Sequence, residues 1–284
     1  MQERLSEAVD ANELPGLHAT VVMLNGERIA EAYFTGEDER WGTPMGVIQH
    51  GPETLHDVRS ITKSVVGFLY GIALDDGIVP DPETPLLDLF PEYSDLRDGT
   101  ARQLITISDA LTMQMGTQWD ESLPYTDPRN SEIAMELAKD RYRFVLNRPM
   151  VADPGTIWTY NGGAVAILAH LISRGAGMDI DEYARVRMFE PLGIADFNWV
   201  RGADGVPSAA SGLRLTARDL ATIGVMIAQG GVYEGRQIVP ASWLEASFRA
   251  QTPIMDGFDY GFLWYIGPGP GGDVTVFAAG NGGQ

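Results

Sequence analysis

The stretch RSITKSVVGF, residues 59–68, decides how this sequence is interpreted. It contains Lys63, and the only other lysine in the chain is Lys139, although arginine is frequent. Apolar residues recur at helical spacing through residues 60–74, which predicts a helix that begins at Ser60. Residues three apart lie on the same face of a helix, so the side chains of Ser60 and Lys63 are predicted to be neighbours.

This pair has the composition of a nucleophile and its base. A serine at a helix N-terminus lies where backbone N–H groups and the helix dipole favour a developing anion. A buried lysine can lose its proton and act as a base, whereas arginine keeps its proton in proteins. We therefore expect an uncharged Lys63 to remove the proton of Ser60. Since Ser-x-x-Lys also arises by chance, a surface lysine in a helix remains the alternative.

Two later segments add candidate residues. DPGTIWTYNGG, residues 153–163, presents Tyr160 in a glycine-rich turn, and a phenol near an ammonium can pass a proton to a leaving group. Taken alone, Tyr160 is more typical of an ordinary core tyrosine. AAGNGGQ, residues 278–284, is rich in glycine, which lets the backbone approach a ligand closely. It could supply one N–H of an oxyanion hole beside the Ser60 N–H, or it could be a simple turn.

Composition excludes several other classes of function. The 284 residues are 44% hydrophobic and 21% charged, as in soluble globular proteins, and no apolar run reaches the length of a membrane span. The formal charge of −19 argues against binding nucleic acid or an anionic membrane through a basic surface. The absence of cysteine excludes disulfides, thiolate catalysis and cysteine-based zinc sites.

The N-terminus bears on localisation. The first residues, MQERLSEAVD, read as an amphipathic helix and lack the basic and apolar regions of a secretory signal. They indicate a cytoplasmic protein, or a periplasmic or secreted one if the N-terminus has been processed.

The order of predicted elements indicates an α+β fold. Residues 16–34 contain two β-rich runs around Asn25-Gly26, a strong hairpin signal, and a polar, glycine-rich stretch follows at residues 35–56. Further helices are predicted at residues 106–115, 131–146, 164–173, 180–189 and 216–229, and strands at residues 260–266 and 273–279. We expect an antiparallel sheet formed from both chain ends, flanked by helices, with residues 1–75 and 200–284 in the sheet region and residues 76–199 mostly helical.

Three segments, one of which contains Tyr160, carry a family resemblance. They are LTMQMGTQWDE at residues 111–121, PGTIWTYNGG at residues 154–163 and GLRLTARDLATIGVMIAQGG at residues 212–231. Together with the Ser-x-x-Lys element, they resemble the serine β-lactamase and penicillin-recognising superfamily. The likeness is greatest to its class C-like branch, which includes carboxylesterases, D,D-peptidases and 6-aminohexanoate-dimer hydrolases.

The resemblance implies a role for each candidate residue. Ser60 would be the acylated nucleophile, Lys63 its base and Tyr160 the proton relay to the leaving group. The oxyanion hole would use the Ser60 amide and the amide that follows Gly280, namely that of Asn281. The resemblance also implies a five-stranded antiparallel sheet with an all-helical region, and neither a metal nor an organic cofactor. By likeness to the 6-aminohexanoate-dimer hydrolases, Tyr125 would contact the substrate.

The sequence departs from the family pattern at two places. The usual Tyr-x-Asn is replaced, because Asn161 directly follows Tyr160 and Gly162 stands where the family has its Asn. The usual Lys-Thr-Gly is replaced by Ala278-Ala279-Gly280, which removes the lysine that helps to hold the carboxylate of a β-lactam. These departures favour a small-molecule ester or amide substrate, with β-lactamase or D,D-peptidase activity as the alternative. The resemblance also places two more strands and a helix after residue 284, so C-terminal strands are expected to be missing from this chain.

Two rival interpretations were weighed. A histidine-based serine hydrolase would need a Gly-x-Ser-x-Gly elbow, which the sequence lacks. The four histidines, His18, His50, His56 and His170, show no metal-binding spacing and are expected to be structural or surface residues. A ligand-binding or sensor domain that is acylated without turnover remains open, because it would use the same residues. Nothing in the sequence indicates an oligomeric state.

Overall fold

A computed structural model describes residues 2–284 apart from residues 12, 98, 100, 256 and 270. Within that part of the chain, no helix is both long and apolar enough to cross a bilayer. The chain begins with α1 (Gln2–Asp10) and an antiparallel hairpin of β1 (Ala19–Leu24) and β2 (Glu27–Tyr33). Asn25 and Gly26 form the predicted turn, and both have positive φ angles, 52° and 84°.

A second hairpin follows where the sequence predicted only a polar stretch. It consists of β3 (Thr35–Arg40) and β4 (Thr43–Gln49), which pair in antiparallel register. Both strands are largely exposed, and β3 has the sequence TGEDER. Because neither face buries apolar side chains, the strands lack the alternation of apolar and polar residues by which a strand is recognised.

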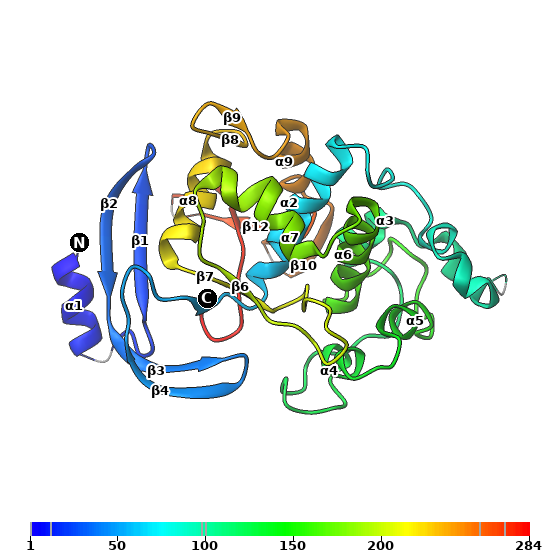
Figure 1. The fold of residues 1–284 in the computed structure, drawn as a ribbon, viewed down its shortest axis with the longest axis horizontal. Coiled ribbons are helices and arrows are strands. Elements are labelled where there is room, and N and C mark those ends of the chain that lie inside the picture. The colour runs from blue at the N-terminus through cyan, green and yellow to red at the C-terminus, as the bar shows by residue number, and fades with distance from the viewer. Residues whose placement is uncertain (1, 12, 98, 100, 256, 270) are drawn as a thin grey trace.

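The central helix of the molecule is α2 (Ile61–Asp75), which begins directly after the short strand β5 (His56–Asp57). Ser60 is the N-cap of α2, as predicted. Twelve of the 15 residues of the helix are buried, so the rest of the protein covers every face of it. Figure 1 shows α2 near the centre, with the helices α3, α4, α5 and α6 on one side and the two N-terminal hairpins on the other. The α2 helix thus connects the two halves of the fold.

Helices dominate the middle of the chain. The α6 helix (Gly162–Ala176) packs against α2, and Asn161 caps its N-terminus through a hydrogen bond from the Ala164 N–H at 3.0 Å. The other helices of this region are η1 (Leu86–Leu89), η2 (Pro91–Leu96), η3 (Ala101–Leu104), α3 (Ile107–Leu111), α4 (Ser131–Glu136), α5 (Arg141–Leu146), α7 (Ile180–Ala184), η4 (Arg185–Phe189) and η5 (Glu190–Leu192).

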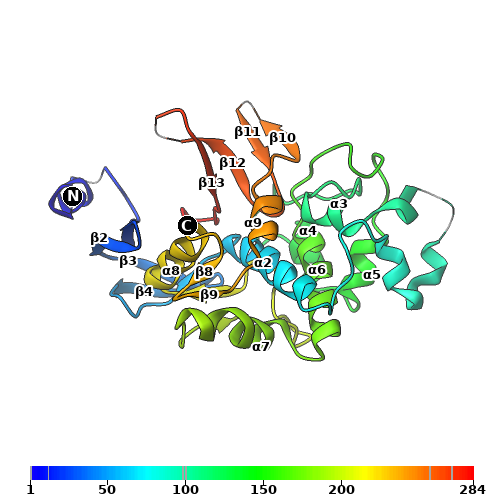
Figure 2. The ribbon, with the colours of Figure 1, turned by 90° about the horizontal axis from the view of Figure 1, so that it is seen from above.

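The last third of the chain returns to mixed structure. Its helices are α8 (Ala217–Ala228), with the predicted N-cap Thr216, and α9 (Ala241–Ser247). Its strands are β6 (Asn198–Trp199), β7 (Leu213–Leu215), β8 (Val232–Tyr233), β9 (Arg236–Gln237), β10 (Thr252–Met255), β11 (Phe258–Tyr260), β12 (Tyr265–Pro268) and β13 (Val274–Phe277). Figure 2 shows β10, β11, β12 and β13 rising beside α9.

The α+β class, with helices and antiparallel sheets, is confirmed, but the sheet is divided. In the described residues β10-β11-β12-β13 form one sheet, β5 and β6 flank β7 in another, and β1-β2, β3-β4 and β8-β9 are separate pairs. The β5-β7-β6 sheet joins a strand from the N-terminal region with strands from the C-terminal third of the chain, as expected, and the other strands pair separately from it.

Two predicted elements are interrupted. The segment 260–266 was expected to be one strand, but it is divided between β11 and β12 by a turn in which Leu263 has a φ of 61°. The predicted helix at residues 131–146 is divided into α4 and α5, because Asp140 starts a new helix by accepting a hydrogen bond from the Arg143 N–H at 3.0 Å. In the first case a backbone turn ends the strand within an apolar run, and in the second a side-chain cap starts a new helix.

Candidate active site

Ser60 is presented by a sharp turn between β5 and α2. Arg59, immediately before it, has a φ of 48°, which is uncommon for a residue with a side chain. Ser60 itself returns to helical angles, and its hydroxyl makes no capping hydrogen bond to α2. The turn therefore leaves the serine oxygen at the helix N-terminus, available to neighbouring groups.

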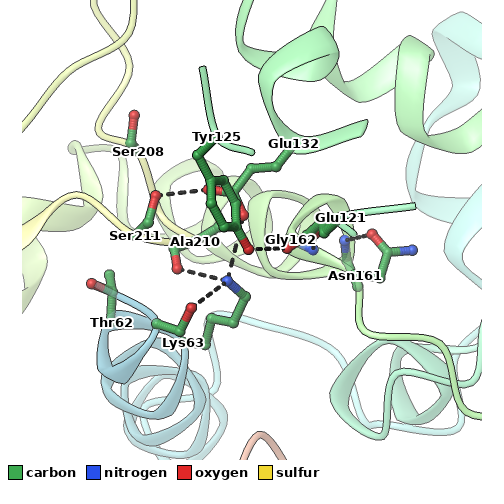
Figure 3. Close-up of polar contacts among 12 residues, drawn as sticks. Thr62, Lys63, Glu121, Tyr125, Glu132, Asn161, Gly162, Ser208, Ala210 and Ser211 are labelled. Atoms are coloured by element: carbon green, nitrogen blue, oxygen red, sulfur yellow. Dashed lines mark hydrogen bonds and ion pairs between the residues drawn. The ribbon is translucent and has the colours of Figure 1, made fainter. Parts of the chain in front are cut away.

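Lys63 lies directly beneath that hydroxyl. Its Nζ donates a hydrogen bond to Ser60 Oγ at 3.3 Å and another to the Ala210 carbonyl at 2.9 Å (Figure 3). The Lys63 side chain is buried, with only 1% of the residue exposed. In addition to the two hydrogen-bond acceptors, its Nζ lies 3.5 Å from Glu132 Oε2, with which it forms an ion pair. The structure thus places the serine and the lysine together, as the i, i+3 spacing predicted.

The charge of Lys63 differs from the sequence-based expectation. Burial by itself lowers the pKa of the ammonium, but the nearby Tyr160, Glu132 and Glu121 raise it by more, so the pKa lies well above its usual value. Lys63 is therefore protonated at neutral pH in the resting site. This direction runs against the expected uncharged amine, because Tyr160, Glu132 and Glu121 reach Lys63 from distant parts of the sequence that the Ser-x-x-Lys pattern does not show.

Glu132 is a site residue that the sequence analysis did not single out. It is 2% exposed in the first turn of α4, where its Oε1 accepts a hydrogen bond from Ser211 Oγ at 2.7 Å. A Cβ atom added to Gly162 would lie 2.5 Å from Glu132 Oε2. The carboxylate therefore fills the space beside Gly162, which accounts for glycine at the position where the family has asparagine.

Glu121 joins the loop that carries Tyr125 to the start of α6. Its Oε1 accepts hydrogen bonds from the Trp119 indole N–H at 2.6 Å and the Gly162 N–H at 2.7 Å, and its Oε2 accepts one from the Tyr125 hydroxyl at 2.9 Å. Burial and the neighbouring Glu132 carboxylate raise the pKa of Glu121. Figure 3 shows Tyr125 beside the Lys63 amine, so the structure brings this predicted contact residue into the site.

Tyr160 approaches Lys63 from the start of α6. The Lys63 Nζ lies 4.8 Å from the centroid of the Tyr160 ring. Tyr265, on β12, has its pKa raised mainly by burial and by the neighbouring Tyr160, with which it shares a hydrogen bond. Tyr265 is a second residue that the sequence analysis missed, because nothing in a strand sequence shows which loop its side chain will meet.

Gly280 lies against the segment that leads to Ser60. A Cβ atom at this position would lie 2.5 Å from the Val58 carbonyl oxygen and 3.1 Å from the Arg59 Cβ, so only glycine allows this approach. Its N–H donates to the Gln284 carbonyl at 2.9 Å, while Asn281 is exposed. The structure thus brings the predicted oxyanion segment to the residues before Ser60.

Comparisons with known proteins give the same family as these motifs. The beta-lactamase family model matches residues 1–284. A 6-aminohexanoate-dimer hydrolase from Paenarthrobacter ureafaciens is 26% identical over 241 residues, which are 80% of this chain and 56% of that protein. The chain therefore spans little more than half the length of this curated relative.

Solved structures with the same fold include two related enzymes. A Bacillus anthracis protein, provisionally assigned as a 6-aminohexanoate-dimer hydrolase, has a TM-score of 0.78 at 23% identity, covering 99% of this chain and 71% of its own. EstCE1, a hydrolase with promiscuous acyltransferase activity, has a TM-score of 0.69 at 16% identity, covering 92% and 80%. At these identities the structures show the shared fold alone.

Proposed function

Because the chain belongs to the beta-lactamase family, we propose that it is a serine hydrolase that forms an acyl-enzyme on Ser60 and cleaves esters or small amides. The observation that carries the proposal is the hydrogen bond of 3.3 Å from Lys63 Nζ to Ser60 Oγ at the N-terminus of α2. A hydroxyl that touches a buried lysine beside a helix N-terminus has a proton acceptor once that lysine is neutral, and a favourable field for the oxyanion.

The proposed reaction has two steps. Ser60 Oγ attacks the substrate carbonyl while its proton passes to the neutral form of Lys63. Tyr160 gives its proton to the departing alcohol or amine and takes the Lys63 proton in its place, which leaves Lys63 neutral again. Water then attacks the acyl carbon, and the acid is released as the proton returns to Ser60. The Ser60 and Asn281 amides would stabilise the oxyanion in both steps. No metal ion or organic cofactor enters the proposal.

The substrate class follows from the charges around Ser60. Glu132 is buried and Glu121 is half-buried beside Lys63. Alanine occupies position 278, where related β-lactamases have the lysine that receives the substrate carboxylate. These features favour a substrate without a carboxylate next to the scissile bond. The names of the relatives refer to a dimer hydrolase and to a hydrolase with acyltransferase activity, which supports acyl-transfer chemistry on amides and esters.

The experiment compares hydrolysis of p-nitrophenyl esters and linear amide oligomers by single variants. Ser60→Ala should abolish turnover, and Lys63→Arg should lower kcat by about 10²–10⁴-fold, the usual contribution of general acid–base catalysis, because arginine keeps the charge but cannot accept a proton. Lys139→Arg is the matched control, since Lys139 is exposed, and it should retain wild-type turnover. Substantial activity in Lys63→Arg would remove the proton-acceptor role.

One observation favours a second candidate function. The raised pKa of Lys63, caused by its acidic neighbours against the effect of burial, keeps the base protonated, which slows any step that needs a neutral amine. A domain that is acylated once and then stays acylated, as a ligand sensor would, fits the same geometry. Such a domain would release one equivalent of p-nitrophenol and then stop, whereas an enzyme continues.

A further inference from the structure

Three of the four histidines of the chain meet outside the candidate active site. His18 immediately precedes β1, His50 immediately follows β4, and His56 begins β5. Together with Asp38 of β3, each offers one ligand atom, and these atoms all lie within 4.8 Å of one another. In Figure 1 the base of the β1–β2 hairpin lies beside the β3–β4 hairpin, which is where these segments come together.

The hydrogen bond of His50 fixes which nitrogen faces the cluster. Its Nδ1 lies 2.7 Å from the Phe34 carbonyl oxygen, which can only accept, so Nδ1 carries the hydrogen. In the neutral ring Nε2 then presents its lone pair, and this atom lies 3.4 Å from Asp38 Oδ2. A lone pair that faces a carboxylate is repulsive, and either a proton on Nε2 or a metal ion between the two atoms relieves it. A backbone carbonyl on the other nitrogen is also the usual support of a metal-binding histidine.

The other two imidazoles are also arranged for a shared ligand. His56 is 6% exposed, and its Nε2 is buried without a hydrogen-bond partner, which leaves a polar atom uncompensated. The ring of His18 stacks on that of His50 with centroids 4.0 Å apart. A Cβ atom at Gly36 would lie 3.1 Å from the His18 ring, so glycine at this position makes room for it.

We propose that His18, Asp38, His50 and His56 bind one divalent transition-metal ion, for which Zn²⁺ is the best fit. Imidazole nitrogens with one carboxylate oxygen are typical zinc ligands, whereas Mg²⁺ and Ca²⁺ prefer oxygen alone. Bonds of about 2.0–2.1 Å in a tetrahedron put neighbouring ligand atoms about 3.3–3.4 Å apart, which the His50–Asp38 pair already matches. The four ligand atoms all lie within 4.8 Å of one another, so His18 and His56 would close the remaining gap when the ion binds.

Four protein ligands make this a structural site. A catalytic zinc keeps one position open for water, while a closed set of four ligands leaves none. The ion would connect the start of β1, the β3–β4 hairpin and β5, and β5 leads to Ser60 four residues after His56. It would therefore hold the strand that positions the nucleophile against both N-terminal hairpins.

The test measures metal binding directly on the full chain. Protein stripped with EDTA and dialysed is titrated with Zn²⁺, bound metal is measured by elemental analysis, and Co²⁺ serves as a spectroscopic probe of geometry. We expect one equivalent of Zn²⁺, intense visible absorption of tetrahedral Co²⁺, and a Tm that rises with Zn²⁺ concentration, as for any ligand of the folded state.

Variants identify the ligands. Asp38→Asn, which is nearly isosteric, and His50→Gln should each weaken Zn²⁺ binding by about 100-fold or more, beyond the 10–100-fold typical for loss of a supporting residue. His170→Gln is the matched control, because His170 lies elsewhere in the fold, on α6 beside Tyr142. It should bind one equivalent like the wild type.

Three results would overturn the site. They are the absence of stoichiometric binding, binding that survives both ligand variants, and equal loss in His170→Gln. Circular dichroism shows that each variant is folded, and Asp38→Asn keeps the test valid if His50→Gln does not fold. Because the readout is bound metal, Ser60→Ala should bind Zn²⁺ normally, so failure of the hydrolase proposal would leave this inference intact.

Discussion

The charge state of Lys63 determines how the proposed reaction depends on pH. Burial lowers the pKa of its ammonium, but Tyr160, Glu132 and Glu121 raise it further, so the neutral amine is a minor form at neutral pH. Since the proposed base must be neutral, activity should be lost as pH falls and should rise toward alkaline pH. The acidic limb of the profile then reports the ionisation of Lys63 in this environment.

Glu132→Gln should move that limb. The substitution keeps the shape of the side chain but removes the negative charge 3.5 Å from Lys63 Nζ, so the pKa of Lys63 falls and the neutral amine forms at lower pH. We expect the acidic limb of kcat/KM to shift to lower pH in this variant. The measurement is kcat/KM as a function of pH for the wild type and Glu132→Gln with the same p-nitrophenyl ester. An unmoved limb, or one shifted to higher pH, would contradict the assignment of Lys63 as the titrating base.

At the scale of residues, the sequence predicted what is local. Ser60 and Lys63 are three positions apart on one helix, so their contact follows from helical geometry. Glu132, on α4, contacts Lys63, and Tyr265, on β12, lies beside Tyr160. Both residues are far from Ser60 in sequence, so no short motif predicts these contacts. The histidine cluster escaped for the same reason, because His18, Asp38, His50 and His56 have no common spacing and meet only through strand pairing.

At the scale of elements, tight packing of α2 gives a stability prediction. A Cβ atom at Gly71 would lie 2.1 Å from the Trp243 ring of α9, and the Trp243 indole N–H donates to the Gly67 carbonyl at 2.9 Å. Gly71→Ala should therefore destabilise the protein by about 1–3 kcal/mol through overpacking, despite the better helix propensity of alanine.

Gly224→Ala is the matched control for this prediction. Gly224 lies within α8, and a Cβ atom there would meet nothing within 4 Å. The same substitution should stabilise the protein by about 0.4–1 kcal/mol, because alanine reduces the entropy of the unfolded chain. Urea denaturation of the two variants measures both effects. A Gly71→Ala protein as stable as the wild type would show that α2 and α9 are less closely packed than described.

The elements that could be predicted are those whose ends carry characteristic turn or cap residues, and elements without such residues could not be predicted. The Asn25-Gly26 hairpin, the N-cap of α8 at Thr216 and the start of α2 each carry a short chemical signature. The β3–β4 hairpin has none, because β3 is mostly charged and both strands are largely exposed. The β11–β12 turn lies within an apolar run, where periodicity continues although the backbone reverses at Leu263.

At the scale of the whole molecule, net charge should influence substrate choice. A formal charge of −19 disfavours the approach of anions, and position 278 lacks the cation that related β-lactamases use. We expect kcat/KM for a neutral p-nitrophenyl ester to exceed that for anionic nitrocefin by at least about tenfold. This factor corresponds to the loss of one hydrogen bond between a charged side chain and the nitrocefin carboxylate. Added salt should narrow the ratio by screening the charge. Efficient nitrocefin hydrolysis at low salt would contradict this substrate class.

The family and the α+β class could be predicted from the whole sequence, because spaced motifs preserve information that single residues lack. The division of the described strands into separate sheets could not be predicted. Pairing between strands that are far apart in sequence is decided by tertiary packing, which no short motif shows.

The central claim is that Ser60 carries the acyl group. It is tested most directly by intact-mass and peptide analysis of the protein quenched in acid during turnover of a p-nitrophenyl ester. The account predicts a mass increase of one acyl group, located on the peptide that contains Ser60, absent in Ser60→Ala, together with continued release of p-nitrophenol. Turnover by Ser60→Ala, or an acyl group located on another residue, would contradict it.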